Sequence, residues 1–141
     1  MRFGRGFKLA LVASLCLATT APALGETWRG IEIDTGGWIP VAKDDDSYVL
    51  VKMRQQQAEN RQVWARFEVS QPKTYASFST RSALALIEFD CANGRSRTLQ
   101  ELSYSDNNLK GDERDGDATD WSYVVAGSNE DNMFKLACNS P

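Results

Sequence analysis

Apolar and polar residues alternate along much of the chain between residues 27 and 105, with the period of two that β-strands show. The clearest case is the segment 62–70, where Val63, Ala65 and Phe67 fall on one side and Trp64 falls on the other. This pattern is typical of an antiparallel strand with one buried face. The sequence therefore predicts a protein built mainly from a sheet.

The most apolar segment after the first 25 residues is 82–91, which is apolar on both sides over most of its length and ends at Cys91. Such a strand is expected to be central in its sheet. Asn93 and Gly94 follow, and this pair favours a hairpin turn because both residues tolerate a positive φ, so 95–105 is predicted to return antiparallel. The other predicted strands are 27–34, 47–54 and 121–125, with 38–42 as an edge continuation limited by Pro40, and 71–80 and 106–120 are predicted loops.

A single helix is predicted near the C-terminus. Ser128 can cap its first turn, and Asp131 three residues later completes a capping-box pattern. Phe134, Ala137 and Cys138 then share one helical face. Together the elements predict an α+β fold, in which a single antiparallel sheet of about six strands carries one packed C-terminal helix.

The chain begins with the features of an export signal. Basic residues at positions 2, 5 and 8 precede an apolar stretch at 9–18, and small residues suit cleavage after Ala23 or Gly25. We therefore expect a cleaved signal peptide over residues 1–25 and one domain over 26–141. The apolar stretch is shorter than the roughly 20 residues that cross a bilayer, and no second long apolar run follows, so no membrane span is expected.

Charge and composition exclude several functions. Residues 1–25 hold three basic and no acidic residues, so the predicted domain has 13 basic against 19 acidic residues, which argues against nucleic acid as a partner. The sequence has no histidine, so it offers no histidine-based triad and no imidazole metal ligand. We expect no cofactor and no enzymatic activity.

Two cysteines, Cys91 and Cys138, remain after the predicted cleavage, because Cys16 lies within the signal. In an oxidising compartment two cysteines predict one disulfide. This bond would fasten the C-terminal helix to the central strand. On the chain-entropy model, closing a loop of this size stabilises the fold by about 4 kcal/mol.

Three groups of residues are candidate sites. The acidic segment 112–117, with Asp120 after it, offers hard oxygen ligands for calcium, but its spacing departs from the EF-hand pattern and a solvated loop is the preferred interpretation. Glu88 and Asp90 share a strand face, as a hydrolase pair would, and as solvated acidic residues commonly do. Trp64 is predicted either to pack on its own sheet or to contact a partner protein.

The order of motifs resembles the bacterial surface-adhesin protein E family. The resemblance covers most of the predicted domain and is carried by these segments: a Val-Trp-x-Arg-Phe strand at 63–67, Glu-Phe-Asp-Cys at 88–91, a basic strand at 95–98, Tyr104, an acidic loop, a tryptophan strand at 121–125, Gly-Ser at 127–128, and a helix that ends in cysteine.

The resemblance implies a small antiparallel sheet with a helix joined to it by a disulfide. It also implies a location in the periplasm or on the outer surface of a Gram-negative bacterium. The function it predicts is an adhesin-like binding domain for host matrix or other extracellular proteins; the alternative is a periplasmic structural or accessory envelope protein. Candidate partners are an extracellular or envelope protein and a second copy of the chain.

Overall fold

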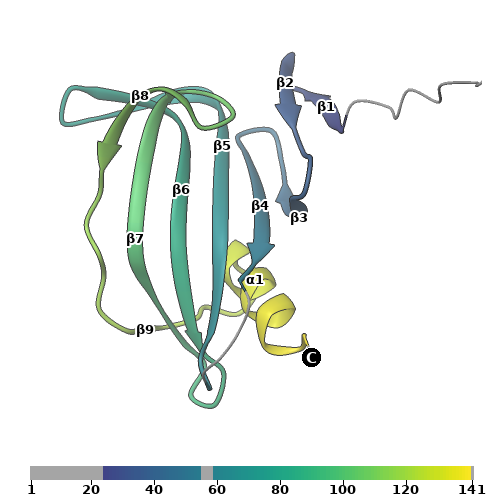
Figure 1. Ribbon diagram of the computed structural model, residues 1–141, viewed down its shortest axis with the longest axis vertical. Helices are drawn as coiled ribbons and strands as arrows, with labels where there is room; N and C mark the ends of the chain where they lie inside the picture. The colour runs from purple at the N-terminus through teal and green to yellow at the C-terminus, as the bar shows by residue number, and fades with distance from the viewer. Residues whose placement is uncertain (1–23, 55–58, 141) are drawn as a thin grey trace, which may run out of the picture.

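The computed structural model describes residues 24–54 and 59–140, which form nine strands and one helix (Figure 1). The elements in chain order are β1 (Gly25–Trp28), β2 (Ile31–Asp34), β3 (Ile39–Lys43), β4 (Ser47–Met53), β5 (Arg61–Tyr75), β6 (Phe78–Asp90), β7 (Arg95–Asp106), β8 (Lys110–Asp115), β9 (Ser122–Tyr123) and α1 (Asn129–Cys138). Residues 1–23 of the predicted signal peptide lie outside the described residues.

The strands form two antiparallel sheets in the described part of the chain, so the prediction of a single sheet of about six strands is wrong. The main sheet has seven strands in the order β3-β4-β5-β6-β7-β8, with β9 also paired to β7. The second sheet is the β1–β2 hairpin. The predicted strand 27–34 folds back on itself at Arg29 and Gly30, whose φ angles of 52° and 78° make the turn, and Trp28 pairs with Ile31.

The main sheet also has longer strands than predicted. Most of the predicted loop 71–80 is the tip of the β5–β6 hairpin, which turns through Ala76 and Ser77 at positive φ. The predicted loop 106–120 contains β8, which pairs with β7 after a turn through Asn108 and Leu109, also at positive φ. Positive φ is unfavourable for most residues other than glycine, and Ala76 and Leu109 are not usual turn formers.

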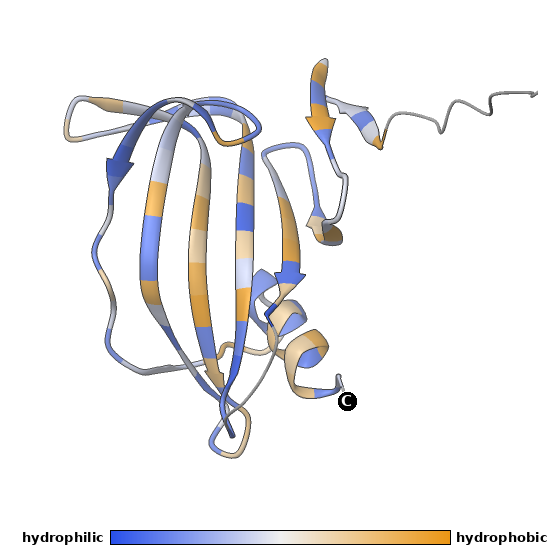
Figure 2. Cartoon of the chain, in the orientation of Figure 1, coloured by the Kyte–Doolittle hydropathy of each residue, from blue (hydrophilic) through white to orange (hydrophobic). Residues whose placement is uncertain are grey.

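The prediction that residues 82–91 form a central strand is confirmed, because β6 pairs with β5 on one side and with β7 on the other. Figure 2 shows a nearly continuous hydrophobic stretch along β6 and an alternating one along β5. The Asn93–Gly94 turn is present, with Gly94 at a φ of 65°. The larger hydrophobic cluster lies between the sheet and α1, and its buried members are Val49, Val51, Val63, Ala65, Ala85, Ile87, Phe89, Met133 and Ala137.

The predicted C-terminal helix is confirmed together with its cap. Ser128 Oγ accepts a hydrogen bond from the backbone N–H of Asp131 at 3.1 Å, and the N–H of Gly127 donates to the Asp131 carboxylate at 2.9 Å. Phe134 contacts Phe89 edge to face, with ring centroids 5.7 Å apart. No helix in the described part of the chain is long and apolar enough to cross a membrane.

Candidate binding surface

The pairing register gives the main sheet two faces of different character. One face carries Val63 and Ala65 and is covered by α1; we call it the helix face. The other carries Trp64, Arg66 and Glu68 and the residues paired beside them, and we call it the tryptophan face. Because neighbouring residues of a strand point to opposite faces, burial under α1 directs Trp64 away from the helix.

The β1–β2 hairpin covers one end of the tryptophan face. Trp28 and Ile33 of the hairpin form a second hydrophobic cluster with Tyr48 and Leu50 of β4. The hydroxyl of Tyr48 is hydrogen-bonded to the Glu26 carboxylate. Burial, together with this carboxylate, raises the pKa of Tyr48 to about 12. The hairpin is therefore attached by both apolar and polar contacts.

A buried ion pair lies under the same end of the face. The side chains of Arg66 and Glu68 are 3% and 0% exposed, and Arg66 Nε donates to Glu68 Oε1 at 2.7 Å. The backbone N–H of Asn108 donates to the same carboxylate at 2.9 Å, and so does Asn107 Nδ2. Arg66 Nη1 donates to the carbonyl of Asp34 at 2.6 Å. Both charges are thus paired and hydrogen-bonded, which is the condition for burying them.

Asn108 completes the attachment of β2. Its Oδ1 accepts hydrogen bonds from the N–H of Asp34 at 2.8 Å and from Arg66 Nη2 at 2.7 Å. Its Nδ2 donates to the carbonyl of Glu32 at 2.8 Å. The side-chain amide therefore pairs with β2 much as a neighbouring strand would.

The opposite end of the tryptophan face is polar. Glu88 pairs with Arg97 at 2.9 Å and Asp90 pairs with Arg95 at 2.8 Å, and both guanidinium groups lie over the ring of Trp121, at 4.5 Å for Arg97 and 5.3 Å for Arg95. Burial raises the pKa of Glu88, but hydrogen bonds from an amide and from Arg97 outweigh this effect and hold its pKa below the usual value.

The pKa of Asp90 is also lowered, mainly by the hydrogen bond from Arg95. A general acid needs a raised pKa. Neither member of the Glu88–Asp90 pair has one. These two residues are the acidic partners of Arg95 and Arg97, whose guanidinium groups lie over the Trp121 ring.

Trp64 lies between these two ends. Its pairing partners on the neighbouring strands are Lys52 and Leu86, and Gln100 pairs with Leu86 on the next strand. Lys52 and Gln100 are exposed, Trp64 is half-buried, and Leu86 is 7% exposed. Trp64 belongs to neither hydrophobic cluster found among residues 24–54 and 59–140. The result is an apolar centre with polar edges, which we call the Trp64 row.

The acidic segment 112–117 differs from the prediction in its structure. It is mostly β8, an exposed strand at the edge of the main sheet, rather than a loop. In the described residues no group of three or more potential ligands could hold a metal ion. The calcium interpretation therefore has no geometric support in this part of the chain.

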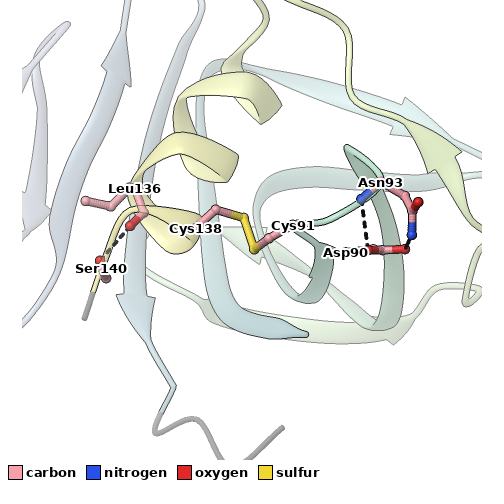
Figure 3. Close-up of a disulfide and its surroundings, with 6 residues drawn as sticks. All are labelled: Asp90, Cys91, Asn93, Leu136, Cys138 and Ser140. Carbon is pink, nitrogen blue, oxygen red and sulfur yellow. Dashed lines mark hydrogen bonds between the residues drawn. A yellow bond between two sulfur atoms is a disulfide. The ribbon is translucent and has the colours of Figure 1, made fainter. Parts of the chain in front are cut away.

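The disulfide joins Cys91, just after β6, to Cys138 at the end of α1, with Cα atoms 5.6 Å apart (Figure 3). Both ends lie in hydrogen-bonded segments. Asp90 accepts from the N–H and the side-chain amide of Asn93 at 3.1 and 2.8 Å, and Ser140 Oγ donates to the carbonyl of Leu136 at 2.6 Å (Figure 3). The bond holds the helix against the end of the central strand.

A hollow on the helix face was not predicted from the sequence. It has a volume of about 360 Å³ and lies between the tip of the β5–β6 hairpin and β7–β8, with Tyr75 and Phe78 among its lining residues. The hairpin tip has no glycine, proline or asparagine to mark it as a turn. The buried Arg66–Glu68 pair was also missed, although opposite charges two residues apart on a half-apolar strand are a usable signal.

The comparisons with known proteins agree with this fold. The sequence profile of the family described as surface-adhesin protein E matches residues 38–139. The chain belongs to the surface-adhesin protein E family. Two crystal forms of Haemophilus influenzae protein E each have a TM-score of 0.55 and 14% identity to the chain; the similarity covers 72% of this chain and 83% and 87% of theirs.

A third structure, protein E from non-typeable Haemophilus influenzae, has a TM-score of 0.52 over 75% of its length. At 14% identity the likeness shows a shared fold. None of the curated proteins that were compared matches the sequence. The predicted membership of the surface-adhesin protein E family is thus confirmed, and the Val-Trp-x-Arg-Phe motif of this member contains both Trp64 and the buried Arg66.

Proposed function

We propose that this family member is an exported, non-enzymatic, adhesin-like domain that binds an extracellular or envelope protein through the Trp64 row. Its membership of the surface-adhesin protein E family supports an adhesin-like surface protein. The predicted signal peptide supports export. No cofactor enters the proposal.

The observation that carries the proposal is the position of Trp64. The indole lies on the face away from α1, outside both hydrophobic clusters of the described residues, with Leu86 beside it and exposed polar residues at either end. Protein interfaces are typically built this way, with an apolar centre and a polar rim, and tryptophan is the residue type most enriched among energetically dominant contacts. The β1–β2 hairpin and Trp121 lie at the two ends of the same face.

The first experiment locates the protein. Intact cells and lysed cells are treated with a protease, and the protein is followed by mass spectrometry. Loss from intact cells is expected for a surface adhesin. Survival in intact cells, with loss after lysis, would contradict surface display and favour the periplasmic accessory protein instead.

The second experiment tests the surface. The purified protein is applied to immobilised extracellular-matrix proteins, and Trp64→Ala is compared with Val125→Ala, a control that removes an exposed apolar side chain outside the Trp64 row. A central tryptophan contact typically contributes at least about 2 kcal/mol, so Trp64→Ala should weaken binding about 30-fold while the control leaves it unchanged. Equal binding by both variants would show that the Trp64 row is not the contact.

A further inference from the structure

The hollow on the helix face has two aromatic walls that face solvent. Tyr75 is 85% exposed and pairs across the hairpin with Phe78, which is half-buried. α1 packs against β3, β4, β5 and β6, whereas Glu101 and Ser103 of the hollow belong to β7. An exposed tyrosine at a hairpin tip is costly to order unless the tip is held in place.

The hairpin tip is held in place by Arg114. Its Nη1 donates to the carbonyls of Tyr75 and Ala76 at 3.3 and 3.2 Å, which ties the turn to β8. The turn itself passes through Ala76 and Ser77 at φ angles of 45° and 69°. Non-glycine residues in this conformation store strain and cluster where a precise backbone position matters. The backbone that carries the two aromatic side chains is therefore held in place.

The hollow carries an excess of negative charge. Glu101, Asp115 and Asp117 all line it. Within the described residues, the side chains of these three carboxylates take part in no salt bridge and no hydrogen bond. Arg114 also lines the hollow, with its Nη1 bonded to backbone carbonyls, so one positive charge stands against three negative charges.

We propose that this hollow binds an arginine side chain of a partner protein. A guanidinium group stacks on aromatic rings and donates bidentate hydrogen bonds to carboxylates, so aromatic walls beside unpaired carboxylates match both of its properties. The inference rests on the proposed function only for the identity of the partner as a protein. It adds a second contact, on the face opposite the Trp64 row.

Gly116 is one of the residues that line the hollow, and it lies next to Glu101. Its N–H donates to the carbonyl of Glu101 at 2.9 Å, and a Cβ placed on Gly116 would lie 3.2–3.3 Å from the Glu101 side chain. Contacts this short require Glu101 to move. Gly116→Ala therefore displaces one carboxylate of the hollow without removing any charge.

The test uses purified protein and a capped glycine-rich hexapeptide with one arginine, followed by amide NMR shifts. The matched probe replaces arginine with citrulline, which keeps the shape and removes the charge. Shifts are expected at residues 75–78 and 114–117 with the arginine peptide, and none with the citrulline peptide. The double variant Asp115→Asn/Asp117→Asn should bind about tenfold or more weakly, and Gly116→Ala should also weaken binding.

Asp46→Asn is the control variant, because it removes an exposed negative charge in the turn before β4. It should bind as the unaltered protein does. Equal binding of the citrulline peptide, unchanged binding by the double variant, or shifts confined to other surfaces would overturn the inference. Equal binding of free arginine amide and the peptide would overturn the assignment to a protein partner in favour of a small cation.

The two proposals fail separately. Binding to matrix proteins without any peptide shift would overturn the hollow alone. Peptide binding by a protein that resists protease on intact cells would overturn surface display alone.

Discussion

Breaking the buried ion pair by Glu68→Ala should cost a large part of the stability of the fold. The carboxylate is 0% exposed, and it accepts hydrogen bonds from Arg66, Asn107 and Asn108. Its removal leaves the Arg66 guanidinium buried, with its charge uncompensated. Through Arg66 and Asn108 the loss extends to the contacts that attach β2 to the main sheet.

The size of the effect follows from this burial. Removing one partner of a buried pair costs about 3–5 kcal/mol, against about 5–15 kcal/mol for the whole domain. With an unfolding entropy of about 2.1 cal/mol/K per residue over a domain of about 115 residues, a loss of about 4 kcal/mol lowers Tm by about 17 °C. Glu68→Gln keeps an acceptor oxygen but not the charge, so it should fall between Glu68→Ala and the unaltered protein.

The assay is urea unfolding followed by tryptophan fluorescence, since the Trp38 ring lies 5.5 Å from the Arg66 guanidinium and reports on this region. The double variant Arg66→Met/Glu68→Leu is the decisive control, because it removes both charges and fills their volume. It should be more stable than Glu68→Ala by at least about 1 kcal/mol. A cost below 1 kcal/mol for Glu68→Ala, or a double variant less stable than the single one, would refute the reasoning.

Three further predictions concern the helix and the turns. Cys138→Ser removes a disulfide between residues 47 positions apart. In thermal unfolding this variant should be about 4 kcal/mol less stable than the oxidised protein. An unchanged Tm would contradict the proposed attachment of the helix. The pKa of Asp131 is lowered by a backbone N–H at the start of the helix and by the neighbouring lysine. The stabilisation by this carboxylate is therefore present above the unfolded-state pKa of about 4 and is lost as the pH falls below it. The difference in unfolding free energy between Asp131→Asn and the unaltered protein should shrink from pH 7 to pH 3, and a constant difference would contradict the role of the ionised carboxylate. Gly111→Ala should lower the free energy of unfolding by more than the roughly 1–2 kcal/mol that a left-handed backbone alone costs, because its Cβ would lie 2.2 Å from Ser105 Oγ. Gly30→Ala is the control, because its Cβ would meet nothing within 4 Å. Equal losses of stability for the two variants in chemical denaturation would show that the close contact is absent.

The central strand and the helix could be predicted because their signals are local. The largely apolar segment 82–91 indicates a strand covered on both sides, and Ser128 with Asp131 marks the first turn of α1. The β5–β6 and β7–β8 hairpins could not be predicted in the same way. Their turns place Ala76, Ser77 and Leu109 at positive φ, and tertiary contacts such as the Arg114 bonds compensate for the local strain.

The tryptophan face shows a different limit of prediction from sequence. Alternation in 62–70 correctly separates Trp64 from Val63 and Ala65, but it cannot show that the β1–β2 hairpin contacts Arg66 while Trp64 stays half-buried. That arrangement depends on contacts such as the one between Asn108 and Asp34, which are 74 residues apart. The candidate site was therefore predicted at one residue, and its boundaries came only from the structure.

The disulfide also has a consequence for the biogenesis of an exported chain. A chain exported N-terminus first would expose Cys91 as a lone thiol until Cys138, 47 residues behind it, also emerged. Between residues 26 and 141 there is no third cysteine, so the first intramolecular bond to form is already the native one. If the domain is exported as proposed, its maturation would need a thiol oxidase but no disulfide isomerase, because the chain offers no second intramolecular pairing.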